Sequence, residues 1–406
     1  MIRIKFSGKL NSTIINLPAS KSISNRLLII NALSYSPYPV KNLSDCDDTL
    51  KLLAALNSGS NKFNAGNAGS TMRFLTAFLS KIVGEWYLTG NEQMNNRPVG
   101  ILVDSINKLG GRIEYVEKEG FPPLKIFGSA LAGGEIEIAG NVSSQFVSAL
   151  LMIAPVMEKG ITIKFKGLIT SKPYIDMTLS LMKQFGIEFT WEKNVIHVSP
   201  QEYCPVPAKV ECDWSAASYW FEIMALSNGE AEIFLNGLNK NSIQGDAIVT
   251  ELFKQLGVKS IFTPKGLKLE KTDSRVEYFN FDFTDYPDIA QTVSVTCAFL
   301  NIPFKLTGLH TLKIKETDRI SALTAELRKF GFDIKNNNSD SLWWDGNKIE
   351  RQTNICLKTC NDHRMAMAFA PAALKTEPFL IENPEVVSKS YPKYWNDLMK
   401  AGFEYS

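Results

Sequence analysis

Apolar segments that end in a glycine and lead into a β-rich run recur along the whole chain. One example is Lys108-Leu-Gly110, which leads into Arg112-Ile-Glu-Tyr-Val, and the same succession returns at intervals of 71 to 76 residues. A glycine directly after a helix is a common stop signal because it adopts the left-handed conformation without strain. The pattern therefore predicts helices that end at Gly110, Gly186, Gly257, Gly331 and Gly402, with Gly59 as a sixth, displaced copy.

Two further series keep the same period. Apolar strands end in turns near Asn42, Gly90, Gly167, Gly237, Gly308 and Asn383. Small or polar residues open apolar helices near Ser20, Asn67, Ser143, Asp213, Asp285 and Asn361. Three series with one spacing predict an α/β protein built from six copies of a βαβαββ-like unit, shortened once near Ser58. Because six such units exceed one hydrophobic core, the 406 residues are expected to form two domains of three units.

Polar clusters follow the strand turns, and several of them contain lysine or arginine. Examples are Asp47-Asp48, Arg97, Lys315 to Arg319 and Lys389. If the helices of a domain run in the same direction, their positive N-terminal ends and these cations gather on one side and attract anions. Helix capping alone explains polar helix starts, but it does not require five separate Arg or Lys residues. The pattern therefore favours an anion-binding cleft over plain capping.

The stretch Ser20-Lys-Ser-Ile-Ser-Asn-Arg26 shows the same chemistry at close spacing. It follows Pro18 and precedes an apolar run, which is typical of a helix start. The backbone N–H groups of a first helical turn, together with Lys21, Arg26 and hydroxyl donors, suit a phosphate or a carboxylate. An ordinary capped helix with two solvated cations explains this stretch equally well, so the hypothesis depends on the other clusters.

Composition restricts the class of protein. Hydrophobic residues make up 45% of the chain, and 44 basic residues nearly balance 42 acidic ones, for a net charge of +2. This balance argues against a nucleic-acid-binding or membrane-surface protein. The longest apolar run, Phe146 to Met157, is too short to span a bilayer, and the first residues lack a signal-peptide core. A soluble, cytoplasmic protein is expected.

Metal chemistry is not expected from the cysteines and histidines. The six cysteines include no Cys-x-x-Cys pair, and Cys356, Cys360 and His363 lack a fourth ligand at a suitable spacing. Scattered reduced thiols fit a reducing compartment. Because the chain has only three histidines, catalysis is expected to depend on Lys, Arg, Asp and Glu.

Nine motifs in one order give the sequence a family resemblance. They are Ser20-Lys-Ser-Ile-Ser-Asn-Arg26, Gly66-Asn-Ala-Gly69, Arg97-Pro98, Ser143-Ser-Gln145, Ser171-Lys-Pro-Tyr174, Pro287-Asp288, Lys315-Glu-Thr-Asp-Arg319, Asn361-Asp-His-Arg364 and Lys389. Each motif alone is a weak signal, but together they span nearly the whole chain. The sequence resembles the 5-enolpyruvylshikimate-3-phosphate (EPSP) synthase family, also called the 3-phosphoshikimate 1-carboxyvinyltransferases.

The resemblance implies an α/β fold of two globular domains, each of three βαβαββ repeats, with the active site in the interdomain cleft. Residues 19–212 would form one lobe, and residues 1–18 with 213–406 the other, so that the chain crosses twice. The implied reaction transfers the enolpyruvyl group of phosphoenolpyruvate to the 5-hydroxyl of shikimate 3-phosphate and releases phosphate. This step belongs to the shikimate pathway to chorismate and the aromatic amino acids. The resemblance implies no metal or other cofactor, no nucleic-acid or membrane partner, and a monomer.

The resemblance also assigns site residues by motif. Asp288 and Glu316 resemble the family's proton-transfer pair, with Lys21 as a third catalytic residue. The implied ligands of shikimate 3-phosphate are Lys21, Ser22, Arg26, Ser143, Ser144, Gln145, Ser171, Asp288 and Lys315. The implied ligands of phosphoenolpyruvate are Lys21, Gly69, Arg97, Gln145, Arg319, Arg364 and Lys389. Which carboxylate performs which proton transfer stays open.

Some positions depart from the family's pattern, and two other functions compete with the implied one. Thr311 stands where the family usually has an asparagine that touches shikimate 3-phosphate, and Phe74 stands where proline is common. These departures concern the shape of the pocket more than activity.

A UDP-N-acetylglucosamine enolpyruvyl transferase shares the implied fold and donor, but it usually carries a loop cysteine and lacks the Ser-Ser-Gln and Lys-Glu-Thr-Asp-Arg patterns. A phosphometabolite-binding protein without activity is the other alternative, and the complete set of charged residues argues against it.

Overall fold

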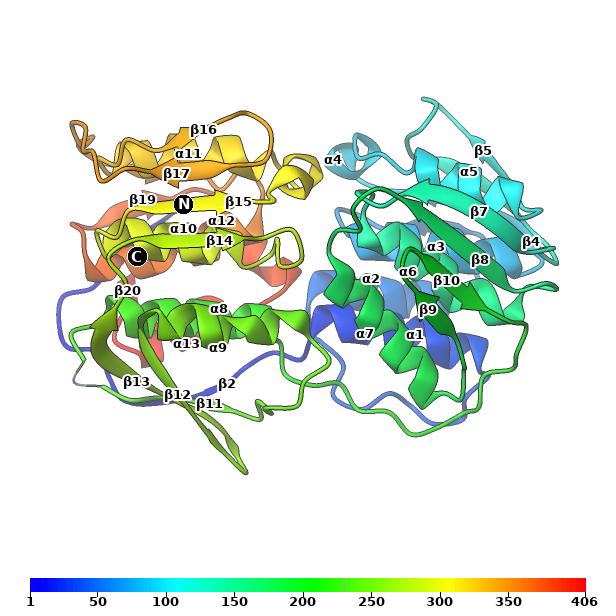
Figure 1. Ribbon diagram of the computed structural model, residues 1–406, viewed down its shortest axis with the longest axis horizontal. Helices are drawn as coiled ribbons and strands as arrows, with labels where there is room; N and C mark the ends of the chain where they lie inside the picture. The colour runs from blue at the N-terminus through cyan, green and yellow to red at the C-terminus, as the bar shows by residue number, and fades with distance from the viewer. Residues whose placement is uncertain (230) are drawn as a thin grey trace. The chain divides into compact units, whose positions relative to one another are not determined.

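The computed structural model describes residues 1–229 and 231–406 of the 406-residue chain. The chain divides into two compact units, each with its own sheets and helices (Figure 1). The N unit comprises residues 19–210, and the C unit comprises residues 1–18 together with residues 211–406. The backbone therefore enters the N unit after Pro18 and returns to the C unit after Val210.

One arrangement of four strands recurs in five sheets of the described chain (Figure 1). Each sheet has a parallel pair at one edge, followed by two antiparallel strands. The N unit contains the orders β3-β4-β6-β5 and β7-β8-β10-β9. These strands span Lys62–Asn64 (β3), Gly84–Thr89 (β4), Arg112–Tyr115 (β5), Leu124–Gly128 (β6), Gly134–Ala139 (β7), Ile161–Lys166 (β8), Thr190–Glu192 (β9) and Val195–Val198 (β10).

The C unit contains the other three sheets, in the orders β12-β13-β11-β2, β14-β15-β17-β16 and β18-β19-β1-β20. Their strands span Ile2–Lys5 (β1), Thr13–Asn16 (β2), Ile233–Asn236 (β11), Leu256–Thr263 (β12), Gly266–Arg275 (β13), Phe279–Asp282 (β14), Phe304–Thr307 (β15), Lys335–Asn336 (β16), Leu342–Trp344 (β17), Cys356–Leu357 (β18), Phe379–Ile381 (β19) and Glu404–Tyr405 (β20). Two parallel neighbours cannot be joined by a tight turn, so a helix connects each such pair that is consecutive in the chain.

The first two strands of the chain lie in sheets whose other strands come from the second half of the sequence. Strand β1 lies between β19 and β20, with Ile4 opposite both Phe379 and Tyr405. Strand β2 runs parallel to β11, with Ile15 opposite Leu235. Residues 1–18 are therefore part of the C unit although they precede the N unit in the chain.

The predicted α/β repeat fold is confirmed, but the sixth copy is incomplete. Where it would carry a sheet, the described chain has a single parallel bridge between Lys41 and Lys209. The helix α2 (Asp47–Leu56) is followed almost at once by β3 of the next sheet, which begins at Lys62. The few residues between them leave no room for the two antiparallel strands, which explains the shortened repeat near Ser58.

Three helices in each unit are buried on nearly all sides. In the C unit all ten residues of α10 are buried, and in the N unit α3 buries eleven of its residues. Such helices carry small or apolar residues around their whole circumference. The six are α1 (Lys21–Leu33), α3 (Gly69–Lys81), α6 (Ser144–Ile153), α8 (Trp214–Leu226), α10 (Ala290–Phe299) and α12 (His363–Phe369).

The remaining helices bury one face or are short. The longer ones are α2, α5 (Gly100–Lys108), α7 (Lys172–Gln184), α9 (Val249–Lys254), α11 (Arg319–Lys329) and α13 (Tyr394–Lys400). The shorter ones are α4 (Glu92–Asn95) and the 3₁₀ segments η1 (Ala154–Val156), η2 (Gly245–Ile248), η3 (His310–Ile314), η4 (Ala370–Leu374) and η5 (Pro384–Lys389).

Most helix boundaries predicted from the repeats are confirmed, but the helix predicted to open near Asp285 begins only at Ala290, and the sixth predicted stop, Gly59, lies beyond the end of α2 and has no positive φ angle. Ser20, Ser143 and Asp213 are N-caps whose side chains accept backbone N–H bonds of the helices that follow them. The five predicted stop glycines all have positive φ angles, and they follow α5, α7, α9, α11 and α13. Local signals therefore set where these helices begin and end.

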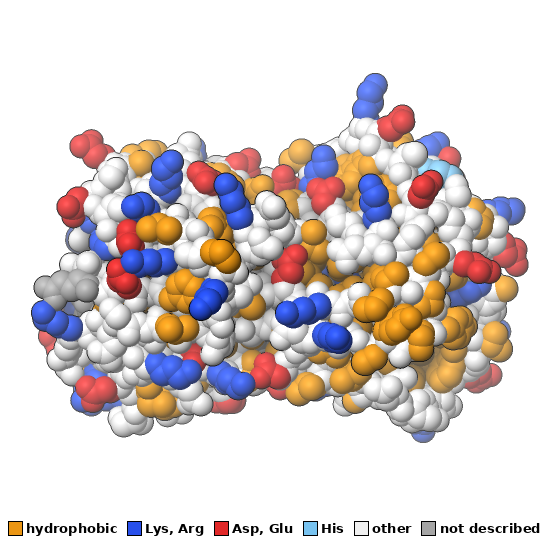
Figure 2. Space-filling view, turned by 90° about the horizontal axis from the view of Figure 1, so that it is seen from below, with side chains coloured by type: hydrophobic (Ala, Val, Ile, Leu, Met, Phe, Trp, Pro, Cys, Tyr) orange, Lys and Arg blue, Asp and Glu red, His pale blue; other side chains and the backbone are white. Residues whose placement is uncertain are grey.

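The surface carries both signs of charge in small groups. Figure 2 shows Lys and Arg side chains interspersed with Asp and Glu on the visible face, as the net charge of +2 leads one to expect. Within the described residues, no helix is both long enough and apolar enough to cross a membrane.

Glu222 is a carboxyl group inside the core of the C unit. It lies on α8 with no exposed surface, one turn after Ser218, whose hydroxyl is 3.2 Å from that of Thr292 on α10. Burial raises the pKa of Glu222 well above its usual value, and a hydrogen bond with Thr296 opposes this only in part. Burial therefore favours the neutral, protonated form of Glu222 in the folded protein.

Because the pKa of Glu222 is raised on folding, its contribution to stability is present in acid and is lost as the pH rises above the unfolded-state pKa of about 4.3. Changing Glu222→Gln should remove this loss, so that the variant gains stability relative to the parent between pH 5 and pH 8. The unfolding midpoint in urea, measured at several pH values, checks this. Glu251→Gln, an exposed change on α9, is the matched control. Parallel pH profiles for parent and Glu222→Gln would contradict the prediction.

Candidate functional site

A cluster of charged side chains lies in the C unit, and its members come from separate segments of the chain. We call it the C-unit charge cluster: Asp288, Lys315, Glu316, Arg319, Asp362, Arg364 and Lys389. The members lie just before α10, between η3 and α11, at the first turns of α11 and α12, and at the end of η5. The sequence predicted six of these seven as site residues, and the structure brings those six together.

Arg319 joins three carboxylates of the cluster. Its Nε is 2.7 Å from Asp362 Oδ2, its Nη1 is 3.2 Å from Asp288 Oδ1, and its Nη2 is 2.9 Å from Glu316 Oε2. Its side chain is only 1% exposed. Asp318 caps α11 by accepting from two backbone N–H groups, which fixes the first turn that carries Arg319. A planar guanidinium with five donors is suited to bridging several carboxylates at once.

Asp288 faces three cations. Arg364 Nη2 lies 2.9 Å from its Oδ2, and Lys315 Nζ lies 3.4 Å from its Oδ1, which also faces Arg319. Burial by itself would raise the pKa of Asp288, but Arg364, Lys315 and Arg319 outweigh it and hold the pKa well below its usual range. Asp288 is therefore ionised at neutral pH as long as these cations face it.

Glu316 lies between Lys389 and Arg319, the second of which it shares with Asp288. Its Oε1 is 2.9 Å from Lys389 Nζ, and its Oε2 accepts from Arg319. The side chains of Glu316 and Lys389 are each 9% exposed. Burial lowers the pKa of the neighbouring Lys315, while Asp288 opposes that shift.

Each cation of the cluster faces a carboxylate of the protein itself. Arg364 and Lys389 each donate to one of the two predicted proton-transfer carboxylates. An anionic ligand that binds these cations therefore competes with Asp288 and Glu316 for them. The arrangement has the chemistry of an anion site whose cations are already occupied by carboxylates.

Asp246 is a buried carboxyl beside the cluster that sequence reasoning did not assign. It accepts a hydrogen bond from Ser215, whose Oγ lies 3.5 Å from Arg364 Nη2. Burial raises its pKa to about 6, with Asp288 adding to the shift and Arg364 opposing it. The only signal in the sequence was the polar cluster from Gln244 to Asp246 after a strand turn.

In the N unit, Lys21 opens α1. Its Nζ is 3.5 Å from Asp48 Oδ2, and its side chain is 16% exposed. Ser20 caps this helix by accepting from the backbone N–H of Ile23 at 3.4 Å. The neighbouring Ser22 uses its backbone carbonyl to accept from Arg26. Lys21 thus lies at a helix N-terminus and pairs with the carboxylate of Asp48.

Arg26 is buried among protein acceptors. Its Nε donates to Thr178 at 2.7 Å and its Nη2 donates to Ser148 at 2.9 Å. Backbone carbonyls of Ser22 and Tyr174 accept two further bonds. Burial lowers the pKa of Arg26 to about 10. In the structure Arg26 ties α1 to α6 and α7, and its contact with shikimate 3-phosphate stays a prediction.

Gly69 is the first residue of α3 and lies against two guanidinium groups. A Cβ atom at this position would be 2.5 Å from Arg73 Nη1 and 2.9 Å from Arg97 Nη1. Arg97 is 7% exposed and precedes Pro98, which restricts its backbone. The absence of a side chain at Gly69 is therefore what leaves space beside Arg97.

The hydroxyl residues predicted for shikimate 3-phosphate lie at two more helix N-termini. Ser143 caps α6 by accepting from the backbone N–H of Gln145 at 3.4 Å, and Ser144 and Gln145 form its first turn. Ser171 precedes α7 in a left-handed conformation, with φ of 53°, and is 4% exposed. Apart from Arg26, which lies in the second turn of α1, the predicted N-unit residues thus lie at helix starts or close before one, and the predicted interdomain cleft stays a prediction.

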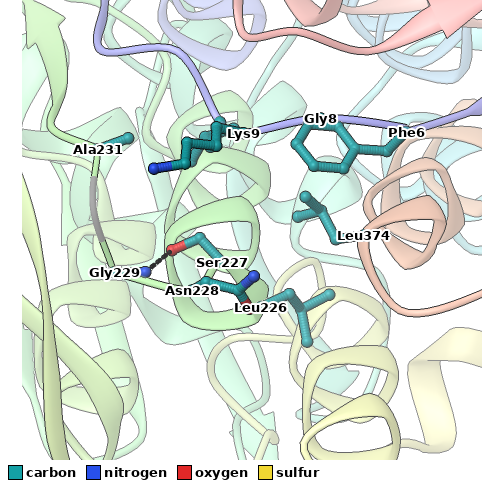
Figure 3. Close-up of a pocket in the computed structure, with 10 residues that line it drawn as sticks. Phe6, Gly8, Lys9, Leu226, Ser227, Asn228, Gly229, Ala231 and Leu374 are labelled. Atoms are coloured by element: carbon teal, nitrogen blue, oxygen red, sulfur yellow. Dashed lines mark hydrogen bonds between the residues drawn. The ribbon is translucent and has the colours of Figure 1, made fainter.

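A separate small pocket lies at the other end of α8 (Figure 3). Phe6, Lys9, Leu226 and Leu374 line it, and Ser227 Oγ accepts from the backbone N–H of Gly229 at 3.3 Å. The thirteen residues of α8 put this end about 20 Å from the helix start beside Asp246. None of the predicted site residues lines this pocket, so it is not the candidate site.

Comparison with known proteins is consistent across sequence and structure. The profile of a family described as EPSP synthase (3-phosphoshikimate 1-carboxyvinyltransferase) matches residues 56–398. A 3-phosphoshikimate 1-carboxyvinyltransferase of Bacteroides fragilis is 53% identical over 390 residues, which cover 96% of this chain and 95% of that protein. The enzyme of the same name from Vibrio atlanticus is 35% identical over 413 residues, covering 95% of each chain.

Solved structures match over the full length. EPSP synthase from Acinetobacter baumannii superposes with a TM-score of 0.77 at 20% identity and covers 100% of this chain and 99% of its own. The enolpyruvyl transferase NikO from Streptomyces tendae gives a TM-score of 0.74 at 13% identity, covering 100% of this chain and 98% of its own. At these identities the likeness shows the fold alone.

Replacing Arg319 with Met should destabilise the C unit by about 3–5 kcal/mol, because the buried Asp362 and the partly buried Asp288 and Glu316 would lose a shared partner. Urea unfolding followed by tryptophan fluorescence measures this. The control is Arg328→Met on the same helix, where an ion pair with Asp333 is half exposed and worth less than about 1 kcal/mol. Equal effects of the two changes would show that Arg319 does not organise the cluster.

Proposed function

The chain belongs to the EPSP synthase family, and we propose that the C-unit charge cluster carries out the chemistry of that family. The protein is a 3-phosphoshikimate 1-carboxyvinyltransferase of the shikimate pathway, which supplies the aromatic amino acids. It transfers the enolpyruvyl group of phosphoenolpyruvate to the 5-hydroxyl of shikimate 3-phosphate and releases phosphate. The observation that carries the role of the cluster is its pair of carboxylates, Asp288 and Glu316, among four cations.

The two substrates together bring two phosphates and two carboxylates, and cations must offset their mutual repulsion. Phosphoenolpyruvate is proposed to bind Lys21, Gly69, Arg97, Gln145, Arg319, Arg364 and Lys389. Arginine suits this role because its planar fork matches carboxylate and phosphate oxygens. Shikimate 3-phosphate is proposed to bind Lys21, Ser22, Arg26, Ser143, Ser144, Gln145, Ser171, Asp288 and Lys315. Both units therefore contribute ligands to each substrate.

The reaction needs a proton donor and a proton acceptor. In the addition step, the 5-hydroxyl oxygen bonds to the central carbon of phosphoenolpyruvate, its proton goes to a carboxylate, and the methylene carbon gains a proton. In the elimination step, phosphate leaves and the methyl group returns a proton. Asp288 and Glu316 are proposed as this pair, with Lys21 assisting at the phosphate. The order in which the two carboxylates act is left open.

Because of the ion pairs in the cluster, the basicity of Asp288 depends on whether substrates are bound. With its cations in place, Asp288 is a weak base because their charge stabilises its ionised form. When an anionic group of a substrate takes Arg364, Asp288 loses part of that stabilisation. The affinity of Asp288 for protons then rises when substrate is bound, which is when the reaction needs a proton acceptor.

We also propose that the protein acts as a monomer in the cytoplasm. Every proposed ligand comes from one chain, so the site needs no second copy. No disulfide joins any of the six cysteines in the described residues, which fits a reducing compartment. Sedimentation of the purified protein tests the oligomeric state.

The function is tested by phosphate release from phosphoenolpyruvate. Release should require shikimate 3-phosphate, and UDP-N-acetylglucosamine should not replace it. Release with the second acceptor only would assign the protein to the other enolpyruvyl transferases, and binding without release would make it a metabolite-binding protein.

Changing Glu316→Gln should abolish turnover and leave shikimate 3-phosphate binding largely intact, because the amide cannot transfer the proton but keeps the shape of the side chain. Phosphate release and calorimetric binding of shikimate 3-phosphate measure the two effects. Glu385→Gln, an exposed change on η5, is the control and should match the parent. If binding and turnover were lost together, the role of Glu316 would be structural.

Changing Gly69→Ala should raise the KM for phosphoenolpyruvate by about tenfold or more, because the new methyl group would displace Arg97 and Arg73. The KM for shikimate 3-phosphate should change less than about twofold. Steady-state kinetics with each substrate varied in turn measure both constants. Gly59→Ala is the control, because a Cβ there meets nothing within 4 Å. An unchanged KM for phosphoenolpyruvate would remove Gly69 from the proposed pocket.

A further inference from the structure

Arg73 is a buried cation that the proposed ligand sets do not include. It lies on α3, one turn after Gly69, and is only 3% exposed. Its guanidinium carbon lies 5.3 Å from the centre of the Phe146 ring. Its Nη2 lies 3.5 Å from the backbone carbonyl oxygen of Pro98. The side chain thus extends from α3 to two other segments of the N unit.

Arg73 contacts the chain neighbours of two proposed phosphoenolpyruvate ligands and lies against a third, Gly69. Phe146 directly follows Gln145 in the first turn of α6. Pro98 directly follows Arg97 in the segment between α4 and α5. Gly69 lies in the turn before Arg73, where a Cβ would be 2.5 Å from Arg73 Nη1. One guanidinium group therefore lies where three separate segments meet.

Arg73 and Arg97 also approach the same face of Gly69. The Cβ position of Gly69 is 2.5 Å from Nη1 of Arg73 and 2.9 Å from Nη1 of Arg97, so the two guanidinium groups lie side by side. Like charges this close in a buried place repel, and an anion beside Gly69 lowers the energy of both. A residue in this place influences the pocket through charge and through the spacing of its walls.

We propose that Arg73 is a positioning residue for phosphoenolpyruvate: it sets the spacing of Gly69, Arg97 and Gln145 and does not itself contact the substrate. This inference rests on the proposed function. Its guanidinium lies over the Phe146 ring while Nη2 donates to the Pro98 carbonyl, and the single ammonium group of a shorter lysine cannot do both. The shape of the Arg73 side chain therefore matters more than its charge.

The test compares Arg73→Lys with Arg73→Met in steady-state kinetics. Both changes should raise the KM for phosphoenolpyruvate by about tenfold or more, since small displacements of ligands are costly. The KM for shikimate 3-phosphate should stay within about twofold of the parent. Arg112→Lys is the matched control, because Arg112 lies over Phe127 at 4.2 Å on the exposed surface of the same unit. It should leave both constants unchanged.

A second variant keeps the inference testable if Arg73 is needed for folding. Phe146→Leu removes the ring on which Arg73 lies and should also raise the KM for phosphoenolpyruvate selectively. Adding Arg73→Lys to Phe146→Leu should then have little further effect, since both changes disturb one contact. Additive effects of the two changes would overturn the inference.

The outcomes separate this inference from the proposed function. If the parent protein releases no phosphate from the two substrates, the proposed function fails first. If the parent is active and Arg73→Lys keeps the parental KM for phosphoenolpyruvate while Arg73→Met does not, Arg73 acts through its charge and the positioning role is wrong. A parental KM in both Arg73 variants overturns it as well.

Discussion

The C unit depends on one constraint: several carboxylates lie close together inside the protein, so they must share cations. Arg319 meets most of this need, since its three nitrogens each face a different carboxylate and its side chain is almost fully buried. Arg364 and Lys389 then complete the partners of Asp288 and Glu316. Buried ion pairs of this kind add little net stability, but the loss of one member is costly because it leaves a charge uncompensated. The cluster is therefore maintained as a whole or lost as a whole.

The same constraint links structure to catalysis. Cations that neutralise carboxylates in the free protein are suitable partners for phosphate and carboxylate groups of substrates. In the proposed function, exchange of one partner for the other weakens the stabilisation of ionised Asp288 without any new residue. In the N unit the proposed ligands lie mainly at helix N-termini, where backbone N–H groups and the helix dipole favour anions. The proposed role of Arg73 extends this picture from ligands to a residue that holds ligands in place.

The sequence predicted the repeat and most helix boundaries because both depend on local signals, whereas the residues of the C-unit charge cluster were assigned through the family resemblance. Glycines with positive φ and capping residues act within one or two turns, so they can be recognised in the sequence. The pairing of β1 with β19 and β20 has no local signal, and only the family resemblance placed residues 1–18 with the second half. The incomplete sixth sheet was visible only as a short interval near Ser58.

Other features escaped prediction because they depend on contacts between distant segments. Arg26 looks like a ligand in a basic motif, yet its partners Ser148 and Thr178 come from two other helices. Asp246 gains its raised pKa from burial beside Asp288, which no spacing in the sequence reveals. Glu222 lies within a mostly apolar helix, and its raised pKa depends on burial in the core around α8.

The central claim is that Glu316 and Asp288 occupy cations that phosphoenolpyruvate needs. Calorimetric titration of phosphoenolpyruvate alone into the parent protein and into Glu316→Gln tests it most directly. The account predicts tighter binding to the variant, because the amide no longer competes for Lys389 and Arg319. Binding that is equally tight or weaker in Glu316→Gln would contradict it.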